Sequence, residues 1–359
     1  MKILVLTRYG PLGASSRLRF HQYFRYLEEH GAELTISPLF DDAYVGRLYS
    51  GRGRSPIEIL AAYGRRVAML RDVRQFDLVW LEKELLPWLP AWLERFLCGT
   101  LPPLVIDLDD AIFHSYDIHR SALVRSALGN KIARLMSRAR LVTAGNEYLA
   151  AYAIQAGTAK VETLPTVVDT ERYQVPSAGA PKGRPLRIGW IGSPATERYL
   201  ASIFPALESV ALQVPLELVA VGAGKLPGAG FPVEIRAWTE ATEAAEIAGF
   251  DVGIMPLPDG PWERGKCGYK LIQYMACGKP VIASPVGVNT SIVRDGSVCG
   301  FLASDTDAWA EAIRRLADDY QLRRQLGAAG REKVERQYSL QVSAPRLWQL
   351  LQEAAEVSR

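Results

Sequence analysis

The stretch of sequence that decides the fold runs from Asp251 to Leu302 and reads DVGIMPLPDGPWERGKCGYKLIQYMACGKPVIASPVGVNTSIVRDGSVCGFL. Its apolar run ends at Pro256, and a glycine-containing turn then enters a helix that carries Lys270. Backbone N–H groups and the positive dipole end at a helix start suit a diphosphate, and Lys266 and Lys270 add positive charge beside it. The stretch therefore predicts a parallel α/β domain with a phosphate-binding turn.

The rest of the chain repeats this alternation of short apolar runs with longer helical stretches, which is typical of a doubly wound parallel sheet. The second half opens with Leu186–Ile191, which runs into a glycine-containing loop and a helix, and continues with Leu216–Gly224. The runs in the first half are Lys2–Thr7, Leu34–Ser37, Leu78–Leu81, Leu104–Leu108 and Leu141–Ala144. We predict two Rossmann-like α/β domains whose sheets face a cleft at the carboxyl ends of their strands.

Composition marks the boundary between the two domains. The segment Pro176–Pro185 is the densest in Pro, Gly and Ser and is a linker by composition. We predict an N-terminal domain over 1–175, a linker over 176–186 and a C-terminal domain over 187–338. Residues 339–359 have apolar side chains at helical spacing and no following strand, so we expect a last helix, with the first domain as one candidate for its packing partner.

Bulk properties narrow the class of protein. The 359 residues are 48% hydrophobic and 23% charged, with a net charge of +3, which is typical of a globular chain rather than a disordered one. No apolar run approaches the roughly 18 residues that span a bilayer, and the start lacks the parts of a signal peptide, so we expect a cytoplasmic protein. The four cysteines lack metal-ligand spacing, and no basic motif for nucleic acid is present.

The stretch 251–302 resembles family 4 (group 1) of the retaining glycosyltransferases. The shared features are a strand ending in Pro, a glycine-rich loop, a helix ending in Met-Ala-Cys-Gly, the strand Pro-Val-Ile-Ala, and Asp-Gly followed by Gly-Phe-Leu. The resemblance covers the chain well from Leu186 onward and the first half more loosely. It implies a GT-B fold and transfer of a sugar from a nucleotide diphosphate-sugar, which is a substrate and not a cofactor. The implied acceptor is a saccharide or a lipid-linked glycan of the cell envelope or an exopolysaccharide.

The chain departs from this family at two positions. The family has two glutamates eight positions apart around the loop, the first at the transferred sugar and the second at the ribose. The corresponding residues here are Gly265 and Gln273. The amide of Gln273 can still hydrogen-bond a ribose. Glu263, two residues before Gly265, is a candidate for the sugar contact, and a plain loop carboxylate is the alternative.

Further phosphate contacts are implied by position in the family pattern. Arg198 falls where a lysine of the family holds the diphosphate, and Ser193 replaces the family's arginine. The other residues assigned to the nucleotide-sugar are Gly268 and Tyr269 beside Lys270, and Gly10 and Arg17 in and after the Gly/Pro loop that follows the first strand. This loop lacks the spacing of a dinucleotide-cofactor fingerprint, which disfavours a dehydrogenase.

The strand Leu104–Leu108 runs into the second candidate site, which holds Asp107, Asp109, Asp110 and then His114. Three carboxylates at one strand end repel one another, so burial should raise the pKa of at least one of them. We predict that Asp109 and Asp110, with His114 second, orient the sugar or the acceptor. A helix cap at Asp110 and a Mg²⁺ site are alternatives, and we predict no metal. Glu82, Lys83 and Glu84, which follow Leu78–Leu81, are weaker candidates for the same place.

Two questions stay open at this point. The aromatic segment Leu85–Leu97 fits either core packing or a membrane interface. Arginines outnumber acidic residues between Arg8 and Arg74, which suits peripheral contact with anionic lipid on the inner face of the cell membrane, or a plain solvated face. For function, the alternatives to sugar transfer are a non-catalytic nucleotide-sugar-binding partner and a GT-B nucleotide-sugar epimerase.

Overall fold

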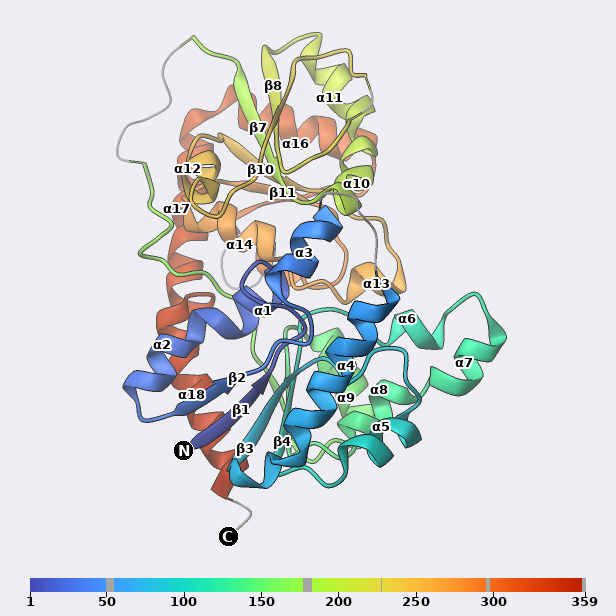
Figure 1. Cartoon of the computed structure of the whole chain (residues 1–359). Coiled ribbons are helices and arrows are strands. Elements are labelled where there is room, and N and C mark those ends of the chain that lie inside the picture. Colours follow the sequence, from blue (N-terminus) through green and yellow to red (C-terminus); the bar gives the residue numbers. More distant parts are fainter. Residues whose placement is uncertain (50–54, 177–182, 227, 295–297, 357–359) are drawn as a thin grey trace. The chain divides into compact units, whose positions relative to one another are not determined.

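The computed structural model of this chain describes residues 1–49, 55–176, 183–226, 228–294 and 298–356. It divides into two compact units, and Figure 1 shows the sheet at the centre of each. The first unit comprises Met1–Thr166, Gly265–Cys267 and the chain from Ser343 onward, and the second comprises Val167–Arg264 and Gly268–Val342. Most of the linker predicted over 176–186 lies outside the described residues, at 177–182.

The first unit is built on a parallel sheet of six strands in the order β2-β1-β3-β4-β5-β6. The central strands are fully buried, because helices cover both faces of the sheet and leave no polar alternation in their sequence. The strands are β1 (Lys2–Leu6), β2 (Glu33–Ile36), β3 (Leu78–Glu82), β4 (Leu104–Leu108), β5 (Leu141–Ala144) and β6 (Val161–Thr163).

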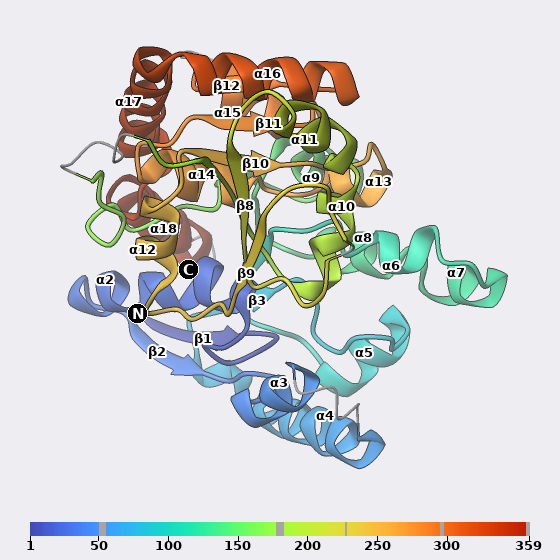
Figure 2. The same cartoon turned by 90° about the horizontal axis from the view of Figure 1, so that it is seen from above.

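Helices lie on both faces of this sheet. Figure 2 shows α2 and α18 on one side of it and α4 and α5 on the other. After α1 the chain forms a π-helical turn, Arg17–His21, before α2 continues it. The α-helices of this unit are α1 (Ala14–Ser16), α2 (Gln22–Glu29), α3 (Asp42–Tyr49), α4 (Pro56–Arg71), α5 (Ala91–Cys98), α6 (His114–Asp117), α7 (Ala122–Leu128), α8 (Lys131–Met136), α9 (Glu147–Gln155) and, from Ser343 onward, α18 (Leu340–Glu356).

The second unit repeats the plan with a parallel sheet in the order β12-β11-β10-β7-β8-β9. Its strands are β7 (Leu186–Ile191), β8 (Leu216–Val221), β9 (Val233–Arg236), β10 (Val252–Met255), β11 (Val281–Ala283) and β12 (Gly300–Leu302). Its α-helices are α10 (Glu197–Ala201), α11 (Phe204–Ala211), α12 (Glu243–Ala248), α13 (Pro261–Arg264), α14 (Tyr269–Ala276), α15 (Asn289–Arg294), α16 (Thr306–Asp318) and α17 (Tyr320–Gln337).

Two apolar cores lie on the two faces of the second sheet. Trp190 and Ile188 of β7 pack with α11 and α16, whereas Ile191 packs with α12, α14 and α17. The predicted fold class, two doubly wound α/β domains, is confirmed by these two parallel sheets. In the part of the chain that the structure describes, no helix is long and apolar enough to cross a bilayer.

Candidate functional site

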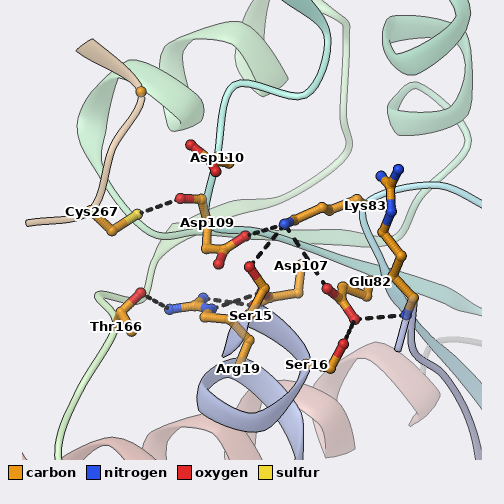
Figure 3. Close-up of polar contacts among 12 residues, drawn as sticks. Ser15, Ser16, Arg19, Glu82, Lys83, Asp107, Asp109, Asp110, Thr166 and Cys267 are labelled. Carbon is orange, nitrogen blue, oxygen red and sulfur yellow. Dashed lines mark hydrogen bonds and ion pairs between the residues drawn. The ribbon is translucent and has the colours of Figure 1, made fainter. Parts of the chain in front are cut away.

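Polar side chains of the first unit meet where β1, β3 and β4 end, because parallel strands bring their carboxyl ends to one edge of the sheet. We call Ser15, Glu82, Lys83 and Asp109 the lysine–carboxylate cluster (Figure 3). Lys83 is its centre: its Nζ lies 2.8 Å from Oδ1 of Asp109, 3.1 Å from Oγ of Ser15 and 3.9 Å from Oε1 of Glu82. One ammonium group therefore links the ends of β3 and β4 to α1.

The backbone of Lys83 has φ +62°, in the left-handed region that non-glycine residues rarely occupy. Such a conformation costs about 1–3 kcal/mol and persists only where the surroundings impose it. Here it directs the lysine side chain from the end of β3 toward Asp109. The residue with the strained backbone is therefore the one whose side chain contacts all other members of the cluster. Backbone strain of this kind is often found at functional sites.

Burial and charge set the protonation of the cluster. Burial by itself would raise the pKa of Asp109, but the ion pair with Lys83 and the hydrogen bond from Ser15 bring that pKa below its usual value. Burial would lower the pKa of Lys83, and Asp109 and Glu82 raise it instead. We predicted a raised pKa for at least one aspartate of this strand end, and Asp109 is not that residue, because a lysine lies within ion-pair distance.

Glu82 has the opposite shift. Burial raises its pKa even though Lys83 is close and its Oε2 accepts hydrogen bonds from Oγ of Ser16 at 2.6 Å and the backbone N–H of Arg8 at 2.7 Å. The cluster therefore contains one carboxylate whose pKa is lowered, Asp109, beside one whose pKa is raised, Glu82.

Asp107 lies outside this cluster, although its position in the sequence grouped it with Asp109. Its carboxylate forms a bidentate ion pair with Arg19, at 2.8 Å to Nε and 2.7 Å to Nη2, and accepts a hydrogen bond from Oγ1 of Thr143 at 2.6 Å. Asp107 and Arg19 are both about 1% exposed. Because Arg19 neutralises the charge of Asp107, this carboxylate does not repel the other two aspartates as we expected. We infer that Asp107 has a structural role.

Asp107→Asn should lower the free energy of unfolding by about 3–5 kcal/mol, since it leaves the Arg19 guanidinium buried without a counter-charge. Urea unfolding followed by circular dichroism measures the change. Glu29→Gln is the matched control: it removes a carboxylate from the exposed pair with Arg25 and should cost about 0.5 kcal/mol or less. Equal effects of the two substitutions would contradict a structural role for the buried pair.

The segment Gly265–Cys267 belongs to the first unit and packs on the residues after β4. Nδ2 of Asn146 donates to the carbonyl groups of Gly265 at 2.9 Å and Lys266 at 3.1 Å, and Sγ of Cys267 donates to the carbonyl of Asp109 at 3.1 Å. Nζ of Lys266 lies 3.8 Å from Oδ1 of Asp110. Asp110 and Lys266, predicted for different tasks, therefore form one ion pair.

Gly265, which stands where the family pattern has its first glutamate, is enclosed. A Cβ atom there would lie 2.5 Å from Cβ of Ala111 and 3.1 Å from its backbone nitrogen. Both distances are shorter than van der Waals contact, so no side chain fits without movement of the backbone. The chain is built around glycine at this position.

His114 lies at the start of α6 and has both ring nitrogens engaged. Nδ1 is 2.8 Å from Oδ1 of Asp117, and Nε2 is 2.8 Å from the hydroxyl of Tyr148. These contacts hold the imidazole among neighbours from α6 and α9. A catalytic task for His114 would require one of these partners to leave.

The loop after β1 holds Gly10, and Arg17 begins the π-helical turn that follows this loop and α1. A Cβ at Gly10 would lie 2.5 Å from Oδ1 of Asp42, which also accepts the backbone N–H of Leu12 at 3.0 Å. Nη1 of Arg17 donates to the carbonyl of Pro11 at 3.1 Å. Glycine is thus required for close packing on α3, and Arg17 is tied to the same loop.

In the second unit, the carboxyl end of β7 carries the residues that we call the β7 group: Trp190, Gly192, Arg198, Tyr199, Glu263 and Lys270. Nζ of Lys270 lies 4.1 Å from the ring centroid of Trp190, a cation–π contact with an indole that is 1% exposed. A Cβ atom at Gly192 would approach this Nζ to 2.7 Å. Because residue 192 is glycine, the ammonium group of Lys270 can lie close to the backbone at this position.

Arg198, Tyr199 and Glu263 form a chain of contacts in the same group. Nη2 of Arg198 donates to the hydroxyl of Tyr199 at 3.1 Å, and that hydroxyl donates to Oε1 of Glu263 at 2.5 Å. Burial and the bond to Glu263 raise the pKa of Tyr199. Ser193 begins the short 3-10 turn Pro194–Thr196, with its backbone N–H 3.4 Å from Oγ1 of Thr196. The sequence singled out Arg198 and Glu263, but not the tyrosine that joins them.

Three residues assigned to the nucleotide-sugar, Gly268, Tyr269 and Gln273, lie at the turn into α14 or within this helix. Gly268 has φ +64°, and a Cβ there would meet Cδ1 of Ile292 at 2.3 Å, so packing within the protein already requires this glycine. Tyr269 follows as the first residue of α14 and is half-buried. Gln273 is 2% exposed, and its Nε2 donates to the hydroxyl of Tyr173 at 2.9 Å. That hydroxyl in turn bonds to Glu243.

The β7 group can bind anions. Lys270 and Arg198 supply positive charge at the strand end, where backbone N–H groups of the following turns are also presented. A guanidinium or ammonium group at such a place binds phosphate oxygens through charge-assisted hydrogen bonds. Within the described ranges, no group of three or more His, Cys, Asp or Glu side chains is arranged to hold a metal ion.

Comparison with known proteins assigns the second unit to a class. Residues 186–319, which include the whole β7 group, match the protein family described as glycosyl transferases group 1. This part of the chain is thus similar to the glycosyl transferases of group 1, and the class of enzyme that the match indicates is a transferase.

Particular relatives match over shorter stretches. The GDP-mannose-dependent monoacylated alpha-(1-6)-phosphatidylinositol monomannoside mannosyltransferase of Corynebacterium glutamicum is 35% identical over 108 residues, which are 30% of this chain and 28% of that protein. The putative teichuronic acid biosynthesis glycosyltransferase TuaH of Bacillus subtilis is 27% identical over 180 residues, 45% of this chain and 44% of that protein. The chain thus matches less than half the length of either relative.

Among solved structures, Anabaena HepE in complex with UDP-glucose is similar to this chain with a TM-score of 0.72. The two share 17% identity, and the match covers 98% of this chain and all of the other. At this identity the likeness concerns the fold, which is GT-B.

Proposed function

We propose that this protein is a glycosyltransferase that moves a sugar from a nucleotide diphosphate-sugar to a saccharide or lipid-linked acceptor in glycan synthesis. The observation that carries the proposal is Lys270, which is held on the Trp190 ring beside Gly192 within the part of the chain that is similar to the glycosyl transferases of group 1. An ammonium group at this strand end suits the diphosphate of a donor and the charge that develops on it as it leaves.

The donor would be held mainly by the second unit. Lys270 and Arg198 contact the diphosphate, and Ser193 and the backbone N–H groups after β7 supply further donors. The complex of HepE with UDP-glucose supports a nucleotide diphosphate-sugar as the class of donor. Gln273 would reach a ribose only by giving up its bond to Tyr173, so the backbone around Tyr269 is the better candidate for the ribose.

The first unit would serve the transferred sugar or the acceptor. Asp109 is kept ionised by Lys83, and an ionised carboxylate can accept hydrogen bonds from sugar hydroxyl groups. We propose a retaining reaction in which the acceptor hydroxyl attacks the anomeric carbon from the face that the diphosphate leaves. We also propose that it needs no metal, since Lys83 already supplies the positive charge beside Asp109.

Two other functions fit specific observations. Gly265 is enclosed and lacks the carboxylate of the family pattern, which favours a non-catalytic nucleotide-sugar-binding partner. Glu263 and Tyr199 form an acid–phenol pair, which an epimerase would need near the sugar ring. Sugar transfer is our first choice because the lysine–carboxylate cluster has strain and perturbed pKa values that mere binding does not need.

The assay that separates these functions incubates the purified protein with UDP-, GDP- and ADP-sugars, with and without a lipid or saccharide acceptor extract. Transfer predicts release of nucleoside diphosphate that requires acceptor, with the sugar appearing in the extract. Tight binding without product from any extract would support the binding partner and refute transfer. A new sugar epimer on an intact donor would support the epimerase.

We also propose peripheral contact with an anionic membrane, on the cytoplasmic face, through α5. The segment Leu85–Leu97 divides: Leu85 and Leu86 are buried in the core, whereas Trp92 is 67% and Phe96 80% exposed, one turn apart on α5. A hollow of about 380 Å³ beside Trp92 is lined by Arg95, Arg134 and Arg138, with Glu94 as the acidic neighbour. Aromatic rings next to arginines suit the headgroup region of an anionic bilayer.

Replacing both Trp92 and Phe96 by serine should reduce binding to phosphatidylcholine vesicles that contain phosphatidylglycerol by about tenfold or more. Cosedimentation of protein with vesicles measures it. The matched control replaces Ile57 and Leu60 of α4, which are 79% and 71% exposed, by serine and should leave binding unchanged. Equal losses in both variants, or no binding by the wild type, would refute contact through α5.

A further inference from the structure

A large pocket of the second unit lies at the amino ends of β7, β10 and β11, the edge of the sheet opposite to the β7 group. It has a volume of about 980 Å³, within the range of small-ligand sites. One face of α17 forms a wall. The basic residues that line it are Arg184, Arg187, Lys279, Arg323, Arg324 and Arg331, and the acidic ones are Asp251, Glu332 and Glu335.

Each acidic residue of this pocket is already paired. Asp251 forms a bidentate ion pair with Arg184, with both N–O distances 2.8 Å. Glu335 lies 2.6 Å from Nε of Arg331, and Glu332 lies 3.5 Å from Arg336, which is outside the pocket. The three acidic residues therefore do not neutralise all of the positive charge in the pocket.

Arg187 pairs with Glu217, which lies outside the pocket, and the remaining positive charge belongs to three residues. Arg323 donates to the carbonyl groups of Leu316 and Ala317 and pairs with no carboxylate of the described chain. Lys279 and Arg324 make no side-chain hydrogen bond or ion pair with the residues that the structure describes. Arg324 is exposed at the pocket, whereas Lys279 is half-buried, and burial lowers the pKa of its ammonium group. A half-buried lysine with no carboxylate at ion-pair distance is stabilised when an anion binds beside it.

The backbone that carries Lys279 is fixed. Gly278 precedes it with φ +66°, and its carbonyl oxygen packs so closely on α17 that a Cβ at Gly327 would lie 2.0 Å away. The ring of Tyr320 and the buried Phe250 add an aromatic component to the walls. The pocket thus combines a fixed turn bearing a lysine, an unpaired arginine and aromatic surface.

We propose that this pocket is a second anion-binding site, which takes a small phosphorylated metabolite with its phosphate on Lys279 and Arg324. An ammonium group and a guanidinium group together bind phosphate oxygens through charge-assisted hydrogen bonds. The site is separate from the proposed donor site and does not depend on sugar transfer. The pocket lies at the amino end of β7, whereas Gly192 follows the carboxyl end. A ligand in the pocket would therefore not take part in the proposed reaction.

The first test uses pyridoxal 5′-phosphate as a probe, because its aldehyde condenses with a neutral amine, releasing water, while its phosphate needs an anion site. Borohydride then adds hydride to the imine and fixes the label, and mass spectrometry of peptides reports each lysine. Lys279 should be labelled about tenfold faster than the exposed Lys225, and inorganic pyrophosphate should protect it. Labelling no faster than at Lys225, or fast labelling that pyrophosphate leaves unchanged, would overturn the proposal.

Two variants add a measurement that does not depend on lysine chemistry. Arg324→Gln should slow labelling of Lys279 by about threefold without changing Lys225. In a Lys270→Gln background, which weakens the proposed donor site, calorimetry should still detect pyrophosphate binding, and Lys279→Gln should reduce that remaining affinity by about tenfold. Pyrophosphate binding that is lost with Lys270→Gln alone would place the only anion site at the β7 group and refute the second one.

Discussion

Asp109→Asn should lower the turnover number for sugar transfer by about 10²–10³-fold while it changes the affinity for nucleoside diphosphate less than about twofold. The substitution removes the ionised carboxylate that Lys83 holds at 2.8 Å and leaves the β7 group untouched. Steady-state rates with the donor found in the nucleotide-sugar panel, together with calorimetry of the nucleoside diphosphate, measure the two quantities. Loss of binding with unchanged turnover would refute the assignment of Asp109 to the sugar or acceptor.

A second variant separates this role from simple destabilisation. Asp109→Asn leaves Lys83 half-paired in a buried place, which costs about 3 kcal/mol of unfolding free energy. Lys83→Met combined with Asp109→Asn removes both charges and should recover most of that stability. Turnover should stay low in the double variant if the carboxylate itself acts on the substrate. Recovery of turnover together with stability would show that Asp109 only supports the fold.

The lowered pKa of Asp109 also predicts how stability depends on pH. Its folded-state pKa lies below the ordinary value of 3.8, so the contribution of this carboxylate is fully present above that pH. It is lost as the pH falls through the lowered value. The melting temperature of Asp109→Asn should therefore fall less steeply than that of the wild type on acidification below pH 3.8. An equal fall in both proteins would contradict the ion pair.

The sequence predicted most of the sheet because most of its strands are buried on both faces. β4, β5 and β7 end where the apolar runs Leu104–Leu108, Leu141–Ala144 and Leu186–Ile191 end. β6 and β9 were missed, since both are edge strands with exposed, charged positions and no apolar run. An edge strand is fixed by pairing with its neighbour, and a single segment does not reveal that partner.

For the candidate site, the sequence indicated where polar side chains gather more than how they pair. Asp109 and Lys270 were selected as candidates because each follows a strand or a turn at an edge of a sheet where ligands bind. The pairing of Asp107 with Arg19, 88 positions earlier, could not be read from local sequence and turned a supposed repulsive cluster into a structural ion pair. Lys83 was ranked low because nothing in the order Glu82, Lys83, Glu84 indicates the left-handed backbone that aims it at Asp109.

Lys270→Gln should weaken binding of the nucleoside diphosphate by about 10–100-fold, because a hydrogen bond to a charged partner is worth about 1.5–3 kcal/mol. Glutamine is one atom shorter than lysine but keeps a polar side chain beside Trp190, and it loses the positive charge proposed to contact the diphosphate. Calorimetric titration at fixed salt measures the loss. Lys225→Gln, which neutralises an exposed lysine of the same unit, is the control and should bind as the wild type does.

Gly192→Ala tests the same place without removing the lysine. The added methyl group would lie 2.7 Å from Nζ of Lys270 and 2.3 Å from Cη2 of Trp190, so it must displace the ammonium group or the indole. We expect a loss of nucleoside diphosphate affinity similar to that of Lys270→Gln, because the charge remains but leaves its position. If Gly192→Ala bound normally while its melting temperature fell, the glycine would serve packing alone. If Lys270→Gln also bound the nucleoside diphosphate with normal affinity, Lys270 would not contact the diphosphate. The diphosphate would then bind elsewhere in the second unit.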